Sequence, residues 1–347
     1  MNQLSLNHDP HRRYNILTGE WVFVSPHRTK RPWQGKVEKT DQEGRPTYDP
    51  QCYLCPGNER AGGHTNDAYT EPYVFTNDFA SLLSDSPEAS YEEGFLKARG
   101  ERGTCRVICF SPNHALTIPE MEEDDLQKVI RTWQREYQSL GQQDFINHVQ
   151  IFENKGAVMG CSNPHPHGQL WAQSSVPLEV VKKTQTQQAY YEQHQRSLLG
   201  DYLAQELEAG DRIILENEYF VALVPFWAVW PYEAMIVPKR PMRDISECFS
   251  EEVVAFAAIF KGLTIRFDNI FQTSFPYSMG IHQRPTDGEA HPEWHWHMSF
   301  YPPLLRSATV KKFMVGYEMF AEPQRDITAE TAAQTLRDVP AVHYKLK

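Results

Sequence analysis

The chain contains 347 residues, enough for one large domain or two modest ones. Its hydrophobic content of 40% suits an ordinary globular core, while a formal net charge of -11 argues against a nucleic-acid-binding surface as the main function. The sequence has no apolar run near the length of a membrane span and no apolar signal segment at its start, so we expect a cytoplasmic protein. Six scattered cysteines are too few for a disulfide scaffold.

The first expected element is a short hairpin within residues 11–33, whose apolar strand is WVFV at 21–24. A basic loop follows it, in which Arg28, Lys30 and Arg31 cluster although the chain is acidic overall. Such a cluster is either an ordinary solvated loop or a clamp in which guanidinium groups bind phosphate oxygens. The residues alone leave both interpretations open.

A C-x-x-C motif comes next, with Cys52 and Cys55 in a tight turn that continues into Pro56 and Gly57. A redox-active pair would more often begin a helix after a strand. A turn with proline and glycine is instead typical of half a zinc site, which needs two further ligands from elsewhere in the chain. The alternative is a turn that binds nothing.

The remaining sequence contains the same order of elements twice, and an exposed acidic excursion at 81–103 separates the first two elements of the first copy. Each half is expected to run strand, strand, helix, strand and His-rich strand. In the first half these fall at 73–79, 106–114, 120–140, 148–152 and 160–172. In the second half they fall at 219–226, 234–240, 250–270, 274–282 and 294–300. We therefore predict a duplicated α+β fold, divided into units at 1–178 and 179–347 and joined through the polar region 185–205.

The His-rich segment of the first half reads GCSNPHPHGQLWA. A period of two places His165, His167 and Gln169 on one face of an extended segment, and the flanking glycines allow the backbone to approach a phosphate. A neutral imidazole, with an ordinary pKa of about 6.5, is a competent nucleophile near neutral pH. The alternative is a Pro-rich turn with surface histidines.

Seven segments spread over nearly the whole chain form a combined pattern: HRRYN at 11–15, FTNDF at 75–79, FENKG at 152–156, NPHPHGQ at 163–169, FPYSMG at 275–280, YPPLLRSATV at 301–310 and FMVGYE at 313–318. This pattern resembles the galactose-1-phosphate uridylyltransferases, a branch of the histidine triad superfamily. The resemblance implies two fused histidine-triad-like units with an extended, mainly antiparallel sheet and flanking helices. It also implies a homodimer in which the C-terminal segment of one subunit completes the neighbour's nucleotide site.

The activity implied by this resemblance is a two-step transfer of a uridylyl group from UDP-glucose to galactose 1-phosphate, which gives UDP-galactose and glucose 1-phosphate. It belongs to galactose metabolism by the Leloir pathway, and involves neither nucleic acid nor a membrane. A related sugar-nucleotide phosphorylase or nucleotidyltransferase is the alternative.

By resemblance, His167 is the nucleophile that takes the uridylyl group, and Gln169 can donate its amide N–H to a phosphoryl oxygen as charge builds there. Related hydrolases carry a third histidine at that position, suited to protonating a leaving group. Glutamine cannot transfer a proton, and a sugar phosphate leaves as a stable anion, so this position favours transfer over hydrolysis. Nucleotide and phosphate contacts carried over from the family are Arg28, Arg31, Asn77, Asp78, Asn154, Gly160, Cys161, Ser162 and Gln169. The partner subunit would contribute Lys312, Phe313, Tyr317, Glu318 and Gln324.

The resemblance also supplies the missing ligands of the C-x-x-C turn. Cys52, Cys55, His114 and His165 match the family's structural zinc site and form a set suited to tetrahedral zinc. Such an ion would hold the His-rich strand in place rather than activate water.

Some relatives hold a second metal, iron, with a glutamate beyond the nucleophile and three histidines in the second half. Here Lys183 falls where the acid would be and Ser299 replaces one histidine. Because a cation beside Lys183 is disfavoured, we expect this second site to be absent or rebuilt. The histidines that remain near it are His282 and His297, with His291 and His295 able to compensate.

Overall fold

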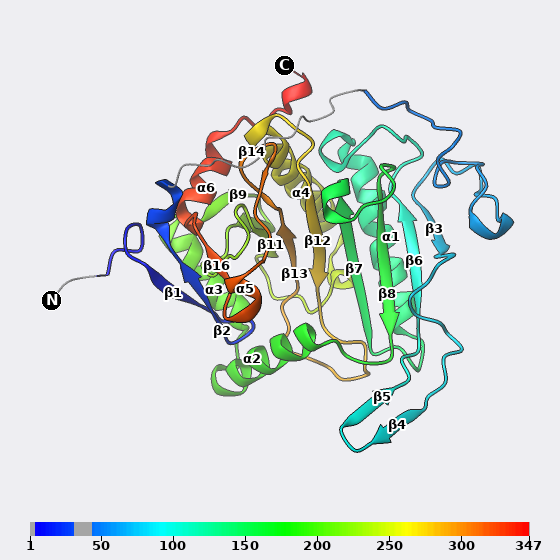
Figure 1. The fold of residues 1–347 in the computed structure, drawn as a ribbon, viewed down its shortest axis with the longest axis horizontal. Helices are drawn as coiled ribbons and strands as arrows, with labels where there is room; N and C mark the ends of the chain where they lie inside the picture. The colour runs from blue at the N-terminus through cyan, green and yellow to red at the C-terminus, as the bar shows by residue number, and fades with distance from the viewer. Residues whose placement is uncertain (1–3, 31–43, 347) are drawn as a thin grey trace.

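The computed structural model describes residues 4–30 and 44–346, and a nine-stranded sheet occupies the middle of this structure (Figure 1). The strand order is β3-β6-β8-β7-β12-β13-β11-β10-β9, and every neighbouring pair is antiparallel. Figure 1 shows the long helices α1 and α4 behind the sheet, where they contact each other. His167 lies on a strand of this sheet, and the possible metal ligands discussed below lie on loops beside it.

The two halves of the sheet repeat one pattern. The first half contains β3 (Tyr73–Thr76), β6 (Gly103–Cys109), α1 (Glu123–Gly141), β7 (His148–Lys155) and β8 (His167–Gln173). The second contains β10 (Phe220–Leu223), β11 (Ala234–Pro238), α4 (Ser250–Phe271), β12 (Tyr277–His282) and β13 (His297–Tyr301). Because β3-β6-β8-β7 is followed by β12-β13-β11-β10, the halves are related by an approximate two-fold axis between β7 and β12. The predicted α+β fold with a duplicated unit is confirmed; the boundary between 178 and 179 stays a prediction.

Hydrophobic periodicity explains why these elements form and how they pack. In α1 the apolar residues at helical spacing, Leu126, Val129, Ile130 and Trp133, are at most 1% exposed, and the apolar stripe of α4 is buried in the same core. Burying each such side chain contributes about 1.5–3 kcal/mol. Three acidic residues in the first turn of α1 also interact favourably with the helix dipole.

The polar junction at 185–205 is mostly helical, because α2 (Leu178–His194) and α3 (Leu198–Ala209) cover it. One expectation about the His-rich segment needs correction. The His-rich strand begins at His167 rather than before His165, so the two histidines do not share a strand face. The acidic excursion is confirmed as exposed, and it contains the hairpin of β4 (Ser90–Glu93) and β5 (Leu96–Arg99).

Segments near the two ends of the chain meet in a second, three-stranded sheet in which β16 pairs with β2 in parallel. We call residues 11–30 and 304–326 the arm. It contains, with the loops that join them, β1 (His11–Asn15), β2 (Glu20–Val24), the 3-10 helix η1 (Pro26–Lys30), β14 (Leu304–Ser307), β15 (Val310–Lys311), α5 (Tyr317–Phe320) and β16 (Gln324–Arg325). Helix α6 (Ala329–Asp338) follows, and β9 (Ile213–Glu216) completes the edge of the large sheet. The other 3-10 helices are η2 (Ala61–Gly63), η3 (Ile118–Glu120), η4 (Ala157–Met159), η5 (Ile245–Glu247) and η6 (Tyr344–Leu346).

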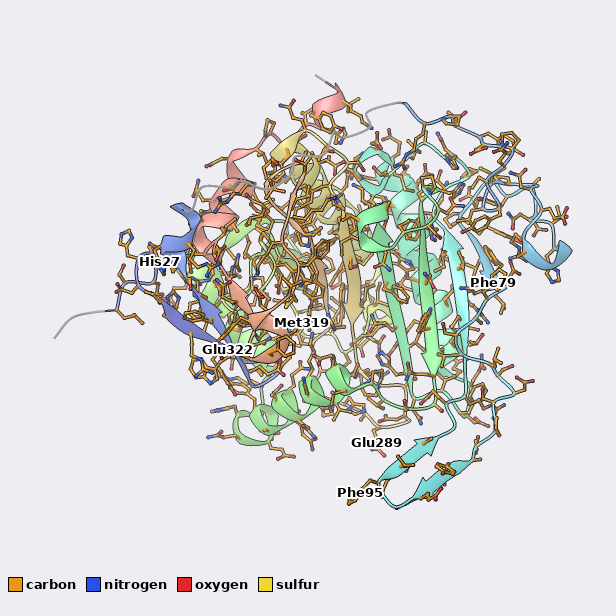
Figure 2. The ribbon with its side chains drawn as sticks, in the orientation of Figure 1. His27, Phe79, Phe95, Glu289, Met319 and Glu322 are labelled. Carbon is orange, nitrogen blue, oxygen red and sulfur yellow. The ribbon has the colours of Figure 1, made fainter. Side chains whose placement is uncertain are left out.

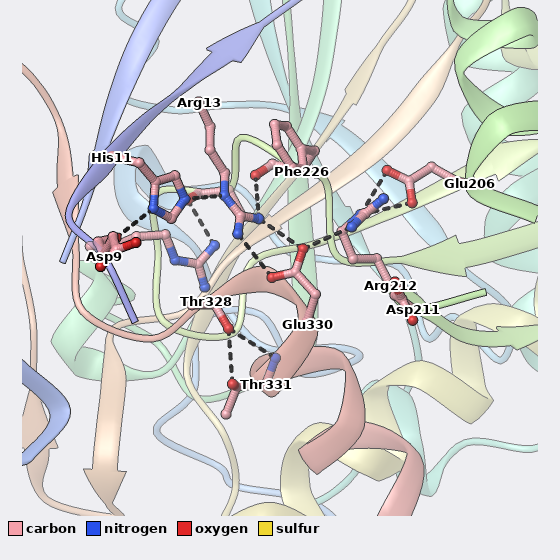
Figure 3. Close-up of polar contacts among 12 residues, drawn as sticks. Asp9, His11, Arg13, Glu206, Asp211, Arg212, Phe226, Thr328, Glu330 and Thr331 are labelled. Carbon is pink, nitrogen blue, oxygen red and sulfur yellow. Dashed lines mark hydrogen bonds and ion pairs between the residues drawn. The ribbon is translucent and has the colours of Figure 1, made fainter. Parts of the chain in front are cut away.

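A chain of buried charges attaches the arm to the rest of the molecule (Figure 3). Arg13 of β1 is 1% exposed and donates two hydrogen bonds, of 2.9 and 3.0 Å, to the carboxylate of Glu330 in α6. Arg212 donates to the same carboxylate at 2.7 Å and to Glu206 of α3. No helix of the described chain is long and apolar enough to cross a membrane.

Candidate active site and metal centre

Four side chains from three separate parts of the sequence meet beside the start of β8. The possible ligand atoms of Cys52, Cys55, His114 and His165 all lie within 4.8 Å of one another, and all four residues are buried. The Cys55 Sγ atom is 3.6 Å from Nδ1 of each histidine. Two thiols and two imidazoles in this arrangement are the donor set that tetrahedral zinc prefers, so the residues present fit a metal ion.

The neighbours of this cluster prepare it for a cation. His165 directs Nε2 to the carbonyl oxygen of Ser111 at 2.9 Å, which places the proton there and leaves the Nδ1 lone pair facing the thiols. Burial lowers the pKa of His165 to about 4, so the ring is neutral at physiological pH. Burial also raises the pKa of Cys55 to about 11, a penalty that a coordinated metal ion would reverse by stabilising the thiolate.

His167 is the first residue of β8 and pairs with Cys109 of β6. Its Nδ1 atom lies 2.7 Å from the carbonyl oxygen of His165, so Nδ1 carries the proton and Nε2 keeps a free lone pair. Burial lowers the pKa of His167, which keeps the ring neutral and therefore nucleophilic. The backbone of a possible metal ligand thus orients the ring of the candidate nucleophile.

Gly168 is required by the packing around that ring. A Cβ atom added there would lie 2.7 Å from the Phe110 ring and 2.9 Å from the carbonyl oxygen of Phe152. Any other residue would therefore push β8 away from β6 and β7.

A cavity of about 290 Å³ opens beside His167. The structure brings several of the predicted contact residues to its wall, namely Asn154, Cys161 and Ser162. Gln169 lies two residues further along β8, and its Oε1 atom accepts a 3.1 Å hydrogen bond from the Trp171 indole. This contact fixes the orientation of the amide and leaves its N–H groups as donors.

The same cavity has charged lining residues that the sequence did not single out. Arg45 donates a 3.1 Å hydrogen bond to the carbonyl oxygen of Pro164, just before His165, and nothing in the sequence around it indicated such a place. Glu153 and Lys155 flank Asn154 in the FENKG segment, and the family resemblance gave neither of them a role. Burial raises the pKa of Glu153 to about 7, and Lys155 is paired at 2.9 Å with buried Asp268.

The other predicted contacts lie elsewhere in the chain. Asp78 follows β3 and sits 3.7 Å from Arg60, while Asn77 accepts a hydrogen bond from the backbone of Phe79. The arm holds Arg28, Lys312, Phe313, Tyr317, Glu318 and Gln324, four of which line a small cavity beside Trp230. None of them lines the His167 cavity. Gly160 adopts a left-handed φ of 81° at the end of η4, and Arg31 lies outside the described residues.

Comparison with known proteins decides the family. Two family models match the chain. The model described as "Galactose-1-phosphate uridyl transferase, N-terminal domain" matches residues 2–177, and the model described as "Galactose-1-phosphate uridyl transferase, C-terminal domain" matches residues 183–347. The chain belongs to the galactose-1-phosphate uridylyltransferase family. It is 52% identical over 338 residues to the galactose-1-phosphate uridylyltransferase of Haemophilus influenzae, which covers 97% of this chain and 96% of the relative. It is 48% identical to that of Saccharomyces cerevisiae, covering 96% of each.

Solved structures of this family and its neighbours share the fold. The chain superimposes on a uridylyltransferase structure with a TM-score of 0.75 and 26% sequence identity, covering 94% of this chain and 97% of the other. An ADP-glucose phosphorylase from Arabidopsis thaliana gives the same TM-score at 22% identity, covering 96% and 99%. The latter similarity shows the fold alone.

The second metal site implied by the uridylyltransferase resemblance does not fit the residues present here. Lys183 places its amine 3.0 Å from Nε2 of His297. The two compensating histidines are both committed elsewhere: His295 contacts the Ser197 hydroxyl and the Pro238 carbonyl, and His291 contacts two carboxylates. Within the described residues, only the Cys2His2 cluster forms a group of three or more possible ligands.

Proposed function

We propose that this chain transfers a uridylyl group from UDP-glucose to galactose 1-phosphate through a covalent intermediate on His167. The observation that carries the proposal is the orientation of His167. Its Nδ1–H donates to the His165 carbonyl oxygen, so the lone pair of Nε2 is free to act as the nucleophile. The names of the relatives support galactose 1-phosphate as the acceptor and a uridylyl group as the group transferred, and UDP-glucose as donor is what the family resemblance implies.

Two displacements with balanced chemistry account for the reaction. Nε2 of His167 forms a bond to the α-phosphorus of UDP-glucose, while the bond from that phosphorus to the bridging oxygen breaks and its electron pair leaves with glucose 1-phosphate. A phosphate oxygen of galactose 1-phosphate then attacks the same phosphorus and displaces the imidazole. The Nδ1–H···O contact with His165 stabilises the positive charge of the uridylylated ring, and the Gln169 amide can donate to the phosphoryl oxygens.

The metal that we propose for the Cys2His2 cluster is zinc, in a structural role. The donor set of Cys52, Cys55, His114 and His165 fills all four tetrahedral positions and leaves none for water or substrate. The ion would anchor the residue whose carbonyl orients the nucleophile. All six cysteines are free thiols, which agrees with our proposal of a reducing, cytoplasmic location.

We further propose a homodimer in which the arm of one subunit completes the partner's site. Tyr317, Met319 and Phe320 of α5 are 54%, 70% and 90% exposed, an unusual concentration of uncovered apolar surface. Figure 2 places Met319 well apart from Phe79, which follows the β3 strand of the catalytic half. Arg28 belongs to the same arm, because it pairs with Asp326 at 3.1 Å, so we assign it to the set that acts on the partner's site.

Mass spectrometry after incubation with UDP-glucose alone tests the proposed chemistry. We expect release of glucose 1-phosphate and a mass gain of one uridylyl group on wild-type protein, absent from His167→Ala. Adding galactose 1-phosphate should remove the group and yield UDP-galactose. An adduct that forms from ADP-glucose in preference, or that is discharged by inorganic phosphate alone, would instead establish the phosphorylase alternative, whose fold the chain shares.

A further inference from the structure

The duplicated fold contains a second copy of the nucleophile segment. Strand β13 stands between β11 and β12 as β8 stands between β6 and β7, and each strand begins with a histidine. In both copies the Nδ1 atom faces the carbonyl oxygen of the histidine two residues earlier, at 2.7 Å for His167 and 3.4 Å for His297. His297 is therefore the structural counterpart of His167.

The two copies differ in what the Nε2 atom meets. His167 lines an open cavity, whereas Nε2 of His297 lies 3.0 Å from the amine of Lys183 in α2. Lys183 is 5% exposed and His297 is fully buried. Because Nδ1 of His297 carries the ring proton, Nε2 is an acceptor, and the Lys183 amine donates to it.

A second imidazole, that of His282, packs against His297. The ring of His282 stacks on that of His297 with centroids 4.8 Å apart and an interplanar angle of 24°. Burial and the nearby Lys183 charge lower the pKa of both rings well below the ordinary value, so both are neutral. The Nε2 atom of His282 is buried and has no hydrogen-bond partner among the described residues. Two neutral imidazoles therefore stack at this place, and one of them accepts a hydrogen bond from the Lys183 amine.

The acidic groups near Lys183 act from a distance. Glu179 and Glu233 raise its pKa through their charge, but burial outweighs them and lowers it to about 7. The Glu233 carboxylate accepts hydrogen bonds from the backbone amides of Val229 and Trp230, and these contacts hold it away from the role of a metal ligand. Ser299, on the same strand as His297, brings no imidazole. A metal ion here would have few ligands and would lie beside a lysine amine.

We propose that the Lys183 amine takes the place of a second metal ion in this half, joining helix α2 to the His297 imidazole, so that each chain holds a single metal centre. The proposal rests on the fold and the side-chain contacts, and it does not depend on the proposed transfer reaction.

The same face of α2 carries two further polar contacts that support a joining role. The Gln187 side chain accepts a hydrogen bond from the backbone of His295 at 3.2 Å, and Trp294 donates to Thr184 at 3.0 Å. Only three residues of α2 are buried, and Lys183 is one of them. The helix therefore depends on polar contacts with the second His-rich segment more than on apolar packing. It begins five residues after the end of β8, so its position also sets where the nucleophile strand leaves the sheet.

Metal analysis tests the first part of the proposal. After exposure to excess zinc or ferrous ion and removal of free metal, we expect about one ion per wild-type chain and about none for Cys55→Ser. The double variant Lys183→Glu/Ser299→His should gain a second ion, whereas the matched control Lys182→Glu/Ser299→His should not, because Lys182 pairs with Glu20 and Glu179 at the surface. Two ions per wild-type chain, one of them retained in Cys55→Ser, would overturn the proposal.

Hydrogen exchange tests the second part without requiring a redesigned site to fold. Lys183→Met keeps the length and apolar stem of the side chain but removes the donor, so the amides of α2 should exchange at least about tenfold faster than in wild type. Lys182→Met is the control and should leave them unchanged. Equal protection of α2 in wild type and Lys183→Met would contradict the joining role. Neither measurement uses substrate, so loss of uridylyl transfer would be recognised separately.

Discussion

The carboxylate of Glu330 joins the arm to the body of the protein. Replacing it by an amide should lower the folding stability considerably, although the side chain keeps its size. Burial alone would raise the pKa of Glu330, but the hydrogen bonds and charges of Arg13 and Arg212 outweigh it and lower the pKa from 4.5 to about 2. A shift of about 2.5 units corresponds to about 3 kcal/mol of folding free energy. Because 20% of the side chain is exposed, solvent screening reduces this, and we expect Glu330→Gln to cost about 2 kcal/mol at pH 7.

The sign of the pH dependence provides an independent check. A depressed carboxyl pKa contributes stability that is complete above the unfolded value of 4.5 and is lost as pH falls through the folded value of about 2. The difference in unfolding free energy between wild type and Glu330→Gln should therefore be constant from pH 7 to about pH 5.5 and smaller by about 1 kcal/mol at pH 4. Urea unfolding followed by tryptophan fluorescence measures it.

Glu322→Gln is the matched control for this experiment. Glu322 also pairs with an arginine of β1, Arg12, at 2.7 Å, but that arginine is 53% exposed. An exposed pair contributes less than about 1 kcal/mol. If Glu330→Gln cost no more than Glu322→Gln, or if its cost did not change between pH 5.5 and pH 4, the buried network would not attach the arm as we infer.

Three further outcomes follow from the site. Cys55→Ser should release the metal and lower the melting temperature. The control Cys248→Ser, whose thiol lies outside the cluster, should retain the metal, and full metal content in Cys55→Ser would exclude our ligand set. Gly168→Ala should destabilise the fold by about 1–3 kcal/mol through its clash with Phe110, and unchanged urea unfolding would show that β8 can move. Because the folded pKa of Glu153 is raised from 4.5 to about 7, ionisation penalises folding progressively as pH rises from 4.5 to about 7 and fully above that. The stability of Glu153→Gln relative to wild type should therefore increase from pH 5 to pH 8.5; a pH-independent difference in urea midpoint would contradict this.

Several features could be predicted because they depend on local pattern. Apolar residues at helical spacing in α1 and α4 and alternation along the strands follow from the geometry of isolated elements, and the order of those elements indicated a duplicated α+β fold. The pairing of Cys52 and Cys55 with His114 and His165 came from resemblance to a family, since no local rule connects residues so far apart in the sequence. The structure brings these four together.

Other features depend on where distant segments meet. The start of β8 at His167 separates the roles of two histidines that alternation alone would have placed on one strand face. Arg45 reaches the cavity because its loop passes beside Pro164, and Arg28 joins the arm through Asp326.

The second histidine segment shows most clearly which features follow from the sequence and which from the tertiary structure. The sequence by itself determined that a lysine and a serine stand where ligands were expected, and so that a metal there was disfavoured. Only the tertiary structure decided what happens instead, because the contact of Lys183 with His297 joins residues 114 positions apart. The direction of a buried amine is set by the helix that carries it and by the sheet against which that helix packs, and neither is encoded in the residues beside the lysine.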